Sequence, residues 1–82
     1  MSDITHRLVG YDRKTEHVVD EYDVLDDLLP QARIIARVPA DDPDVALCYR
    51  LAENEALDLA GFLRAKIAPF ERDYFLEGFA AE

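Results

Sequence analysis

Apolar and polar residues alternate along the first part of the chain with the two-residue period of a β-strand. Residues 4–11 form one such segment, and residues 17–24 form a second in which valines and a tyrosine interleave with acids. Residues 12–16 between them are typical of a turn, because the Asp12 carboxylate can accept a backbone N–H from further along the chain. The pattern predicts an antiparallel hairpin with one face in contact with water.

The alternation leaves two registers open for this hairpin. Tyr11 pairs with Glu16 in one register and with His17 in the other, and Arg7 lies opposite an acid in both. Glu16 occupies a turn position at which glycine is usual. We therefore expect either a non-glycine residue at positive φ or a different type of loop.

Two helical segments and two further strands follow. A helix begins near Asp27, where acids satisfy free N–H groups and a proline in the first turn loses no intrahelical hydrogen bond. A strand over residues 45–51 comes next, with its odd-numbered positions facing the core. Helical spacing predicts a second helix over residues 53–67, and the aromatic-rich residues 74–79 form a last strand.

This order, ββαβαβ, predicts a single α+β domain over residues 1–82. Two helices and four short strands favour two layers, in which a four-stranded, largely antiparallel sheet carries both helices on one face. Half of the residues are hydrophobic, which is enough for a small core. A chain of this length leaves little room for a deep pocket.

Four short motifs occur in order along nearly the whole chain. They are RLVGYDRKT at residues 7–15, DPD at 42–44, YRL at 49–51 before an acidic helix start, and DYFLE at 73–77. In these motifs the chain resembles a family of small bacterial proteins classed as a domain of unknown function. The resemblance implies no activity, so no catalytic residue follows from it. The chain departs from the family pattern at Ala52, where a serine or threonine helix cap is expected.

The charge of the chain narrows the range of partners. Nine Lys and Arg against 18 Asp and Glu give a net charge of −9 and a pI near 4.5. A phosphate-binding surface needs clustered cations, so we expect neither nucleic acid nor an anionic membrane as a partner. The apolar runs are far shorter than the roughly 20 residues of a membrane helix. Because Cys48 is the single cysteine and no export signal is visible, we expect a cytoplasmic location.

Few residues could support catalysis. Cys48 could pair with His6 or His17 as a thiol and an imidazole, but a lone cysteine in a strand is typically a small buried hydrophobe. Neither hairpin register places the two histidines opposite each other, which argues against a metal site between them. The acids at positions 41, 42 and 44 lack the alternate spacing, glycine and distal glutamate of a calcium loop. We therefore expect no enzymatic activity, no cofactor and no metal.

The placement of charge gives the leading functional hypothesis. Six acids lie within residues 16–27 with no Lys or Arg among them. Such a segment can steer a basic protein partner, as acidic inhibitors and immunity-type proteins do for basic enzymes, with a tyrosine as an aromatic anchor. The alternative is a solvated strand edge and a capped helix that keep the protein in solution. The candidate binding residues are Asp20, Glu21, Tyr22, Asp23, Asp26 and Asp27.

The aromatic last strand supports a second hypothesis, a homodimer through its exposed face or its edge. Tyr74 and Leu76 face one way in a strand, while Phe75 and Phe79 face the other. The candidate dimer surface comprises Tyr74, Phe75 and Phe79, unless the chain covers these residues itself. A third hypothesis, a small-ligand protein or enzyme that uses Cys48 and a histidine beside a shallow pocket, has the least support.

Overall fold

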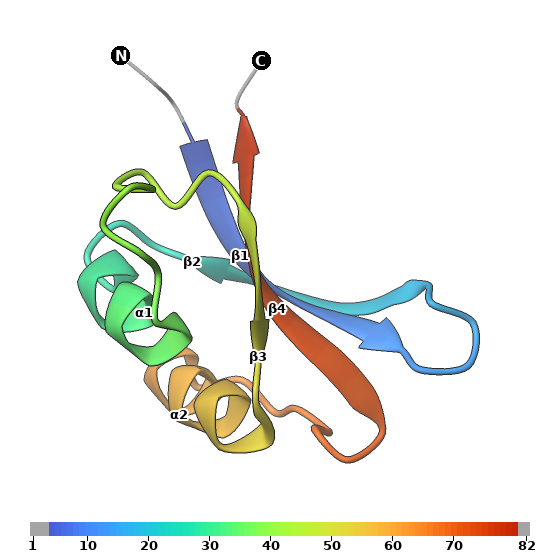
Figure 1. The fold of residues 1–82 in the computed structure, drawn as a ribbon. Helices are drawn as coiled ribbons and strands as arrows, with labels where there is room; N and C mark the ends of the chain where they lie inside the picture. Colours follow the sequence, from blue (N-terminus) through green and yellow to red (C-terminus); the bar gives the residue numbers. More distant parts are fainter. Residues whose placement is uncertain (1–3, 81–82) are drawn as a thin grey trace.

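The computed structural model describes residues 4–80 and shows an α+β fold in two layers (Figure 1). Its strands form one antiparallel sheet in the order β2-β1-β4-β3. The predicted element order and the predicted antiparallel sheet are confirmed. The elements are β1 (Ile4–Asp12), β2 (Val18–Val24), α1 (Leu29–Ala36), β3 (Cys48–Leu51), α2 (Glu53–Leu63) and β4 (Arg72–Ala80).

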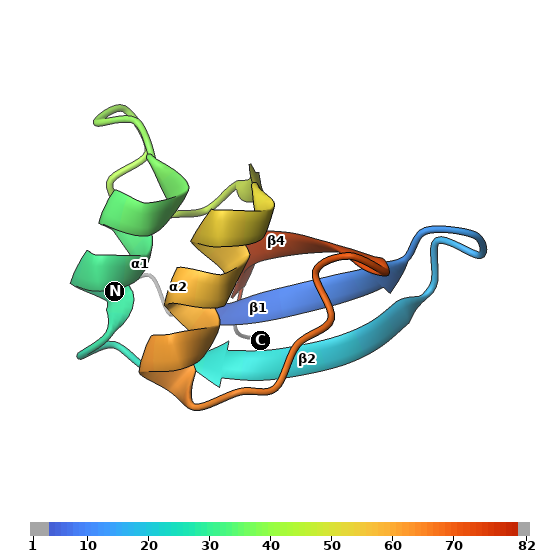
Figure 2. The ribbon, with the colours of Figure 1, turned by 90° about the horizontal axis from the view of Figure 1, so that it is seen from below.

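Both helices pack against the same face of the sheet, as predicted (Figure 2). Strand alternation places Leu8 of β1 with Tyr74 and Leu76 of β4 on that face, and all three side chains are fully buried. They form one core cluster with Ala32 of α1 and Leu59 of α2. Removal of these large apolar side chains from water is the main stabilising contribution to the fold.

The hairpin of β1 and β2 adopts neither of the two expected registers. Tyr11 pairs with Val18, and the register shifts between Gly10 and Tyr11. Beyond this bulge, Arg7 lies opposite Asp23. The expectation that Arg7 faces an acid is confirmed, but the pairing of both strands is displaced.

The longer turn explains this displacement. The Asp12 N–H donates to the His17 carbonyl at 2.9 Å, so residues 13–17 all lie outside the ladder. The Asp12 carboxylate accepts two backbone N–H groups of the turn at 2.7 and 3.0 Å, as predicted. Glu16 adopts a φ of 62°, which confirms positive φ at a non-glycine residue.

The strand predicted over residues 45–51 is shorter, because Asp42 binds the backbone that precedes it. The Asp42 carboxylate accepts the N–H groups of Ala46 at 2.9 Å and Leu47 at 3.1 Å. Val45 adopts a φ of 50°, which is incompatible with a strand. β3 therefore begins at Cys48. Val45 is buried, but Leu47 is 63% exposed, so the prediction that Leu47 faces the core is wrong.

α1 begins later than predicted and without a side-chain cap. Its N-cap is Leu28, and its second residue is a proline, as expected for a first turn. Backbone carbonyls of Leu25 and Asp26 accept the N–H groups of Leu28 and Leu29. The prediction that the preceding acids cap this helix with their side chains is therefore wrong.

α2 follows Ala52 directly and ends earlier than predicted. No side-chain cap hydrogen bond forms at Ala52, as expected from its methyl group. The Glu55 carboxylate accepts the Ala52 N–H at 2.8 Å, which is one half of a capping box. The helix ends at Leu63 because Arg64 adopts the left-handed conformation.

Candidate functional site

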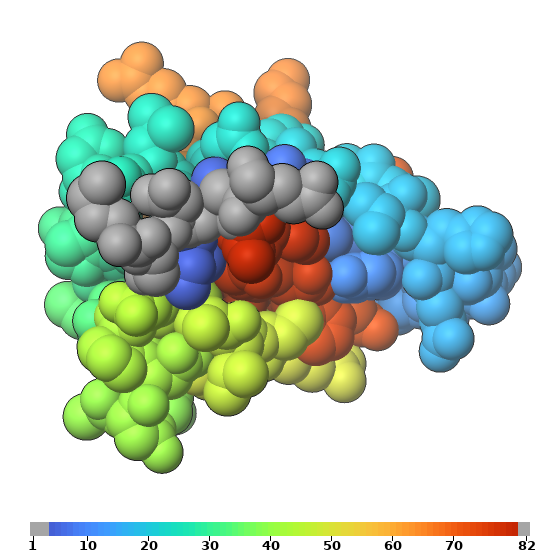
Figure 3. Space-filling view, turned by 90° about the horizontal axis from the view of Figure 1, so that it is seen from above, coloured from blue at the N-terminus to red at the C-terminus, as the bar shows by residue number. Residues whose placement is uncertain are grey.

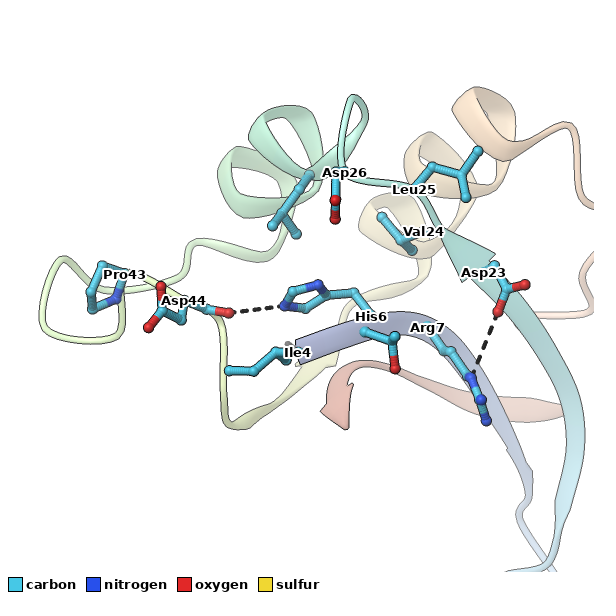
Figure 4. A pocket seen from close by; sticks show the side chains of 11 residues that line it. Ile4, His6, Arg7, Asp23, Val24, Leu25, Asp26, Pro43 and Asp44 are labelled. Atoms are coloured by element: carbon cyan, nitrogen blue, oxygen red, sulfur yellow. Dashed lines mark hydrogen bonds and ion pairs between the residues drawn. The ribbon is translucent and has the colours of Figure 1, made fainter. Parts of the chain in front are cut away.

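A cleft of about 710 Å³ lies at the end of the molecule opposite the hairpin turn. Its walls come from the start of β1, the end of β2, the turn before α1 and the loop after α1 (Figure 4). Figure 3 shows this loop beside the segment that contains α1. We call the site the acidic cleft; it is lined by Ile4, Thr5, His6, Arg7, Asp23, Val24, Leu25, Asp26, Leu29, Pro43 and Asp44.

The imidazole of His6 lies in this cleft. His6 shares the core face of β1 with Leu8, and only 5% of it is exposed. Its Nε2 lies 2.9 Å from the carbonyl oxygen of Asp44. Because a carbonyl only accepts, Nε2 is the donor of this contact, and in a neutral ring this leaves Nδ1 as an acceptor. Nδ1 is buried and has no hydrogen-bond partner within residues 4–80.

The loop that holds Asp44 is fixed from two sides. Asp42 accepts hydrogen bonds from the Tyr49 hydroxyl and from the Ala46 N–H, and these bonds lower the pKa of its carboxyl. Arg33 of α1 donates to the Pro43 carbonyl at 2.8 Å. The loop conformation that places the Asp44 carbonyl against His6 is thus built by its own side chains.

Two carboxylates of the predicted binding set reach the acidic cleft. In Figure 4 the carboxylate of Asp26 points toward the His6 ring. Asp23 lies at the rim, where its carboxylate is 3.7 Å from the Arg7 Nε. Within residues 4–80, neither Asp26 nor Asp44 forms an ion pair. Negative charge from two segments of the chain therefore gathers here, and of these carboxylates only that of Asp23 is paired with a cation in the part of the chain that the structure describes.

Other members of the predicted set lie elsewhere. The Asp20 carboxylate is mostly buried on the helix face, where it accepts bonds of 2.6 Å from both Arg72 and Tyr74. Tyr22 is also on the helix face, and its hydroxyl donates to the Lys66 carbonyl at 2.8 Å. An anchoring role for Tyr22 at the centre of an acidic surface does not fit this position.

The remaining two acids of the predicted set are exposed. Glu21 lies on the open face of the sheet, the face that carries no helix, and pairs with Arg7 at 3.4 Å. Asp27 lies in the turn before α1. The predicted set is thus divided among the helix face, the open face and the acidic cleft.

Sequence reasoning missed the participation of His6 and Asp44 in the same site as Asp26. Alternation placed His6 on the side of Leu8, and Asp44 stood out as part of an acidic loop. No sequence pattern indicated that the loop after α1 returns to the start of β1.

The predicted dimer surface is divided between the two faces of the sheet. Tyr74 is 1% exposed within the core, so its place in that surface is a wrong prediction. Phe75 and Phe79 lie on the open face, where Tyr11 packs edge-to-face on Phe75 and the Arg7 guanidinium lies 4.8 Å from the Phe79 ring centre. β4 pairs with β1 along its length and with β3 over residues 74–77, so the second edge of its central part is already occupied.

Cys48 is exposed on the open face, contrary to the expectation of a buried thiol. It lies opposite Glu77, whereas His6 occupies the other face, so the thiol and imidazole considered as a pair are separated by the sheet. Desolvation, and then the Glu77 carboxylate, raises the pKa of the Cys48 thiol to about 11. The thiol is therefore protonated at neutral pH, which is the reverse of activation.

Within residues 4–80, no group of three or more His, Cys, Asp or Glu side chains is placed to hold a metal ion. In the same part of the chain, no helix has both the length and the apolar character needed to cross a bilayer.

Comparison with known protein families shows to which family the chain belongs. The model of a family described as a domain of unknown function, DUF7683, matches residues 5–77. This chain belongs to the DUF7683 family. The match runs from β1 into β4 and thus includes every element of the DUF7683 fold described above. No curated protein and no solved structure matches the chain significantly.

Proposed function

We propose that this DUF7683 domain is a non-enzymatic binding module whose acidic cleft receives a basic protein partner. The observation that carries the proposal is that acids of two segments line the same cleft, Asp23 and Asp26 from residues 23–27 and Asp44 from residues 41–44. Within residues 4–80, four of their acids form neither an ion pair nor a hydrogen bond through the carboxylate. These four acids are Asp26, Asp27, Asp41 and Asp44.

Charge in this arrangement acts mainly on the rate of encounter. A cleft lined by one sign of charge raises the association rate of an oppositely charged partner, and salt weakens the effect. Arg7 and Arg33 are the cations that contact these segments, and Arg7 is already paired with Glu21 and Asp23. The field at this end therefore favours a cationic partner and opposes nucleic acid and anionic membranes.

The open face gives less support to the other two hypotheses, an enzyme and a homodimer. Its possible nucleophiles are held protonated. The hydrogen bond to Glu77 raises the pKa of Tyr11 to about 12, and the raised pKa of Cys48 keeps its thiol protonated as well. A homodimer through Phe75 and Phe79 remains the alternative proposal. The free cysteine is consistent with a reducing, cytoplasmic location, which we include in the proposal.

The proposal is tested by comparing how well the wild type and two variants capture a partner. The two variants lose the same number of charges at different places on the surface. The cleft variant carries Asp26→Asn and Asp44→Asn in the lining of the cleft, and Asp27→Asn and Asp41→Asn in the same two segments. The control variant loses the same charge from exposed acids elsewhere, through Glu16→Gln, Glu53→Gln, Asp58→Asn and Glu71→Gln. We expect a stoichiometric basic partner on the wild type and the control, and its loss from the cleft variant.

Association kinetics then separate specific from general charge effects. The purified partner should associate with the wild type at a rate that falls steeply with salt, and the cleft variant should lose most of that dependence. Equal association rates for the cleft variant and the control at low salt would contradict the proposal. A doubled molar mass in light scattering, unchanged by the cleft variant, would favour the homodimer instead.

A further inference from the structure

The acidic cleft contains a buried hydrogen-bond acceptor that the described residues leave without a donor. His6 is 5% exposed, and its Nδ1 has no partner within residues 4–80. The bond from Nε2 to the Asp44 carbonyl fixes the ring, so Nδ1 cannot turn toward another group without loss of that bond. Buried acceptors in native proteins are rarely left unpaired. This position therefore indicates a ligand that supplies a donor.

A second acceptor faces the same space. The Asp26 carboxylate points toward the His6 ring from the turn before α1 (Figure 4). A neutral imidazole nitrogen and a carboxylate both accept hydrogen bonds, so they cannot bond to each other directly. A group with positive charge and several N–H donors satisfies both of them.

The chemistry of the site distinguishes between the possible cations. Within residues 4–80, too few potential ligands converge for a metal ion. An ammonium group is compact and strongly hydrated, so its transfer into a partly buried site is costly. A guanidinium group is planar and more weakly hydrated, and it presents several N–H donors in a fixed fork. The guanidinium group therefore fits a buried acceptor beside a carboxylate better.

We propose that the acidic cleft binds an arginine side chain of the partner, an inference that rests on the proposed function. One guanidinium N–H donates to His6 Nδ1, and others donate to the Asp26 carboxylate. The apolar side chains of Ile4, Val24 and Leu25 line the cleft and contact the aliphatic stem of the arginine. A volume of about 710 Å³ accommodates such a side chain together with part of the chain that carries it.

The first test uses small probes and the full chain. N-acetyl-arginine amide, the lysine analogue and the neutral citrulline analogue are titrated into ¹⁵N-labelled protein at neutral pH, and the imidazole nitrogens are observed by NMR. We expect the arginine probe to move the Nδ1 resonance of His6 in the direction of an accepted hydrogen bond. His17, which is exposed in the hairpin, is the internal reference and should not move.

The lysine and citrulline analogues show which chemical group the cleft binds. Loss of one charge-assisted hydrogen bond weakens binding by about tenfold to a hundredfold, and we expect the citrulline probe to show at least this loss. Lysine binding as tight as arginine binding would overturn the assignment to a guanidinium. A His6 ring that is doubly protonated before any probe is added would also overturn it, because Nδ1 would then donate to Asp26. The assignment would likewise be overturned if the Nδ1 resonance did not move at a saturating concentration of the arginine probe. Water alone would then satisfy Nδ1.

Two variants keep this inference separable from the proposed function. The amide nitrogen of glutamine reaches about as far as Nε2, so His6→Gln can keep the bond to the Asp44 carbonyl while it removes the Nδ1 acceptor. We expect His6→Gln and Asp26→Asn each to weaken the arginine probe and the captured partner, with melting temperatures near that of the wild type. A partner that is lost from the four-acid cleft variant but retained by His6→Gln would leave the proposed function standing and remove the arginine contact.

Discussion

Gly78 shows how a single position affects both the sheet and the acidic cleft. It lies opposite His6 in the ladder between β1 and β4, beside the loop that holds Asp44. A Cβ at this position would clash with the Val45 carbonyl oxygen, and backbone cannot move away as a flexible side chain can. The absence of a side chain at Gly78 thus permits the loop to close over the start of β1.

Gly78→Ala is therefore expected to be destabilising. We expect a loss of about 1–3 kcal/mol from overpacking, measured by urea unfolding, together with a shifted His6 resonance. Gly61→Ala is the matched control, because Gly61 is exposed in α2 and a Cβ there meets no atom within 4 Å. The control should gain about 0.5–1 kcal/mol from helix propensity. Equal effects of the two changes would show that the contact with Val45 is not restrictive.

The thiol of Cys48 gives a second prediction for a single residue. With a pKa of about 11, it should react with iodoacetamide at pH 8 roughly tenfold or more slowly than an unperturbed cysteine, although it is exposed. Glu77→Gln removes the nearby negative charge and should raise the rate severalfold, while desolvation persists. Glu16 lines a depression on the open face together with Cys48 and Glu77, so Glu16→Gln is the control and should leave the rate unchanged. An unaltered rate in Glu77→Gln would assign the shift to desolvation alone.

Among the elements, the loop between α1 and β3 is organised by Asp42. Its carboxylate binds two backbone N–H groups and the Tyr49 hydroxyl, and the Tyr49 hydrogen bond is the largest cause of its lowered pKa. Because the pKa in the folded state lies below the ordinary value of 3.8, these bonds stabilise the fold at every pH above that value. The stabilisation is lost as the pH falls through the folded-state pKa.

The consequence is a defined difference in acid unfolding. Wild-type stability, measured as the urea midpoint, should fall as the pH drops below about 4. Asp42→Asn should be less stable at pH 7 and should show a smaller fall, since its amide does not titrate. Asp12, whose pKa is lowered by hydrogen bonds within the hairpin turn, contributes the same acid loss to both proteins. Asp41→Asn, one residue away, should follow the wild-type curve. Parallel curves for the wild type and Asp42→Asn would contradict this role.

The same loop shows where elements could and could not be predicted from the sequence. Periodicity identified every helix and strand in order, because burial of one face imposes period 2 on strands and period 3.6 on helices. Boundaries were wrong where a side chain bound backbone groups or where the backbone left the regular conformation. Asp42 withdraws residues 46 and 47 from the strand, and the positive φ of Arg64 ends α2. The hairpin register depended on the length of its turn, which alternation does not report.

At the scale of the whole molecule, the site could be predicted only in part. Both acidic segments were visible as charge in the sequence, yet Asp20 shows that an acid in such a segment can be buried in an ion pair. The juxtaposition of His6, Asp26 and Asp44 arises from the fold, because the loop after α1 returns over the start of β1. Charge runs thus predicted two acids of the cleft, Asp23 and Asp26, but not the position of His6 beside them.

We expect the concentration of acids at the acidic cleft to cost stability, which would distinguish a binding site from a structural feature. Asp26 and Asp27 do not cap α1 with their side chains, so their charges repel one another without a compensating contact. The four-acid cleft variant should therefore melt a few degrees higher than the wild type at low ionic strength. The difference should vanish in about 1 M salt, where the Debye length is near 3 Å. If these acids instead served to stabilise the helix start, the variant would melt lower than the wild type in both conditions.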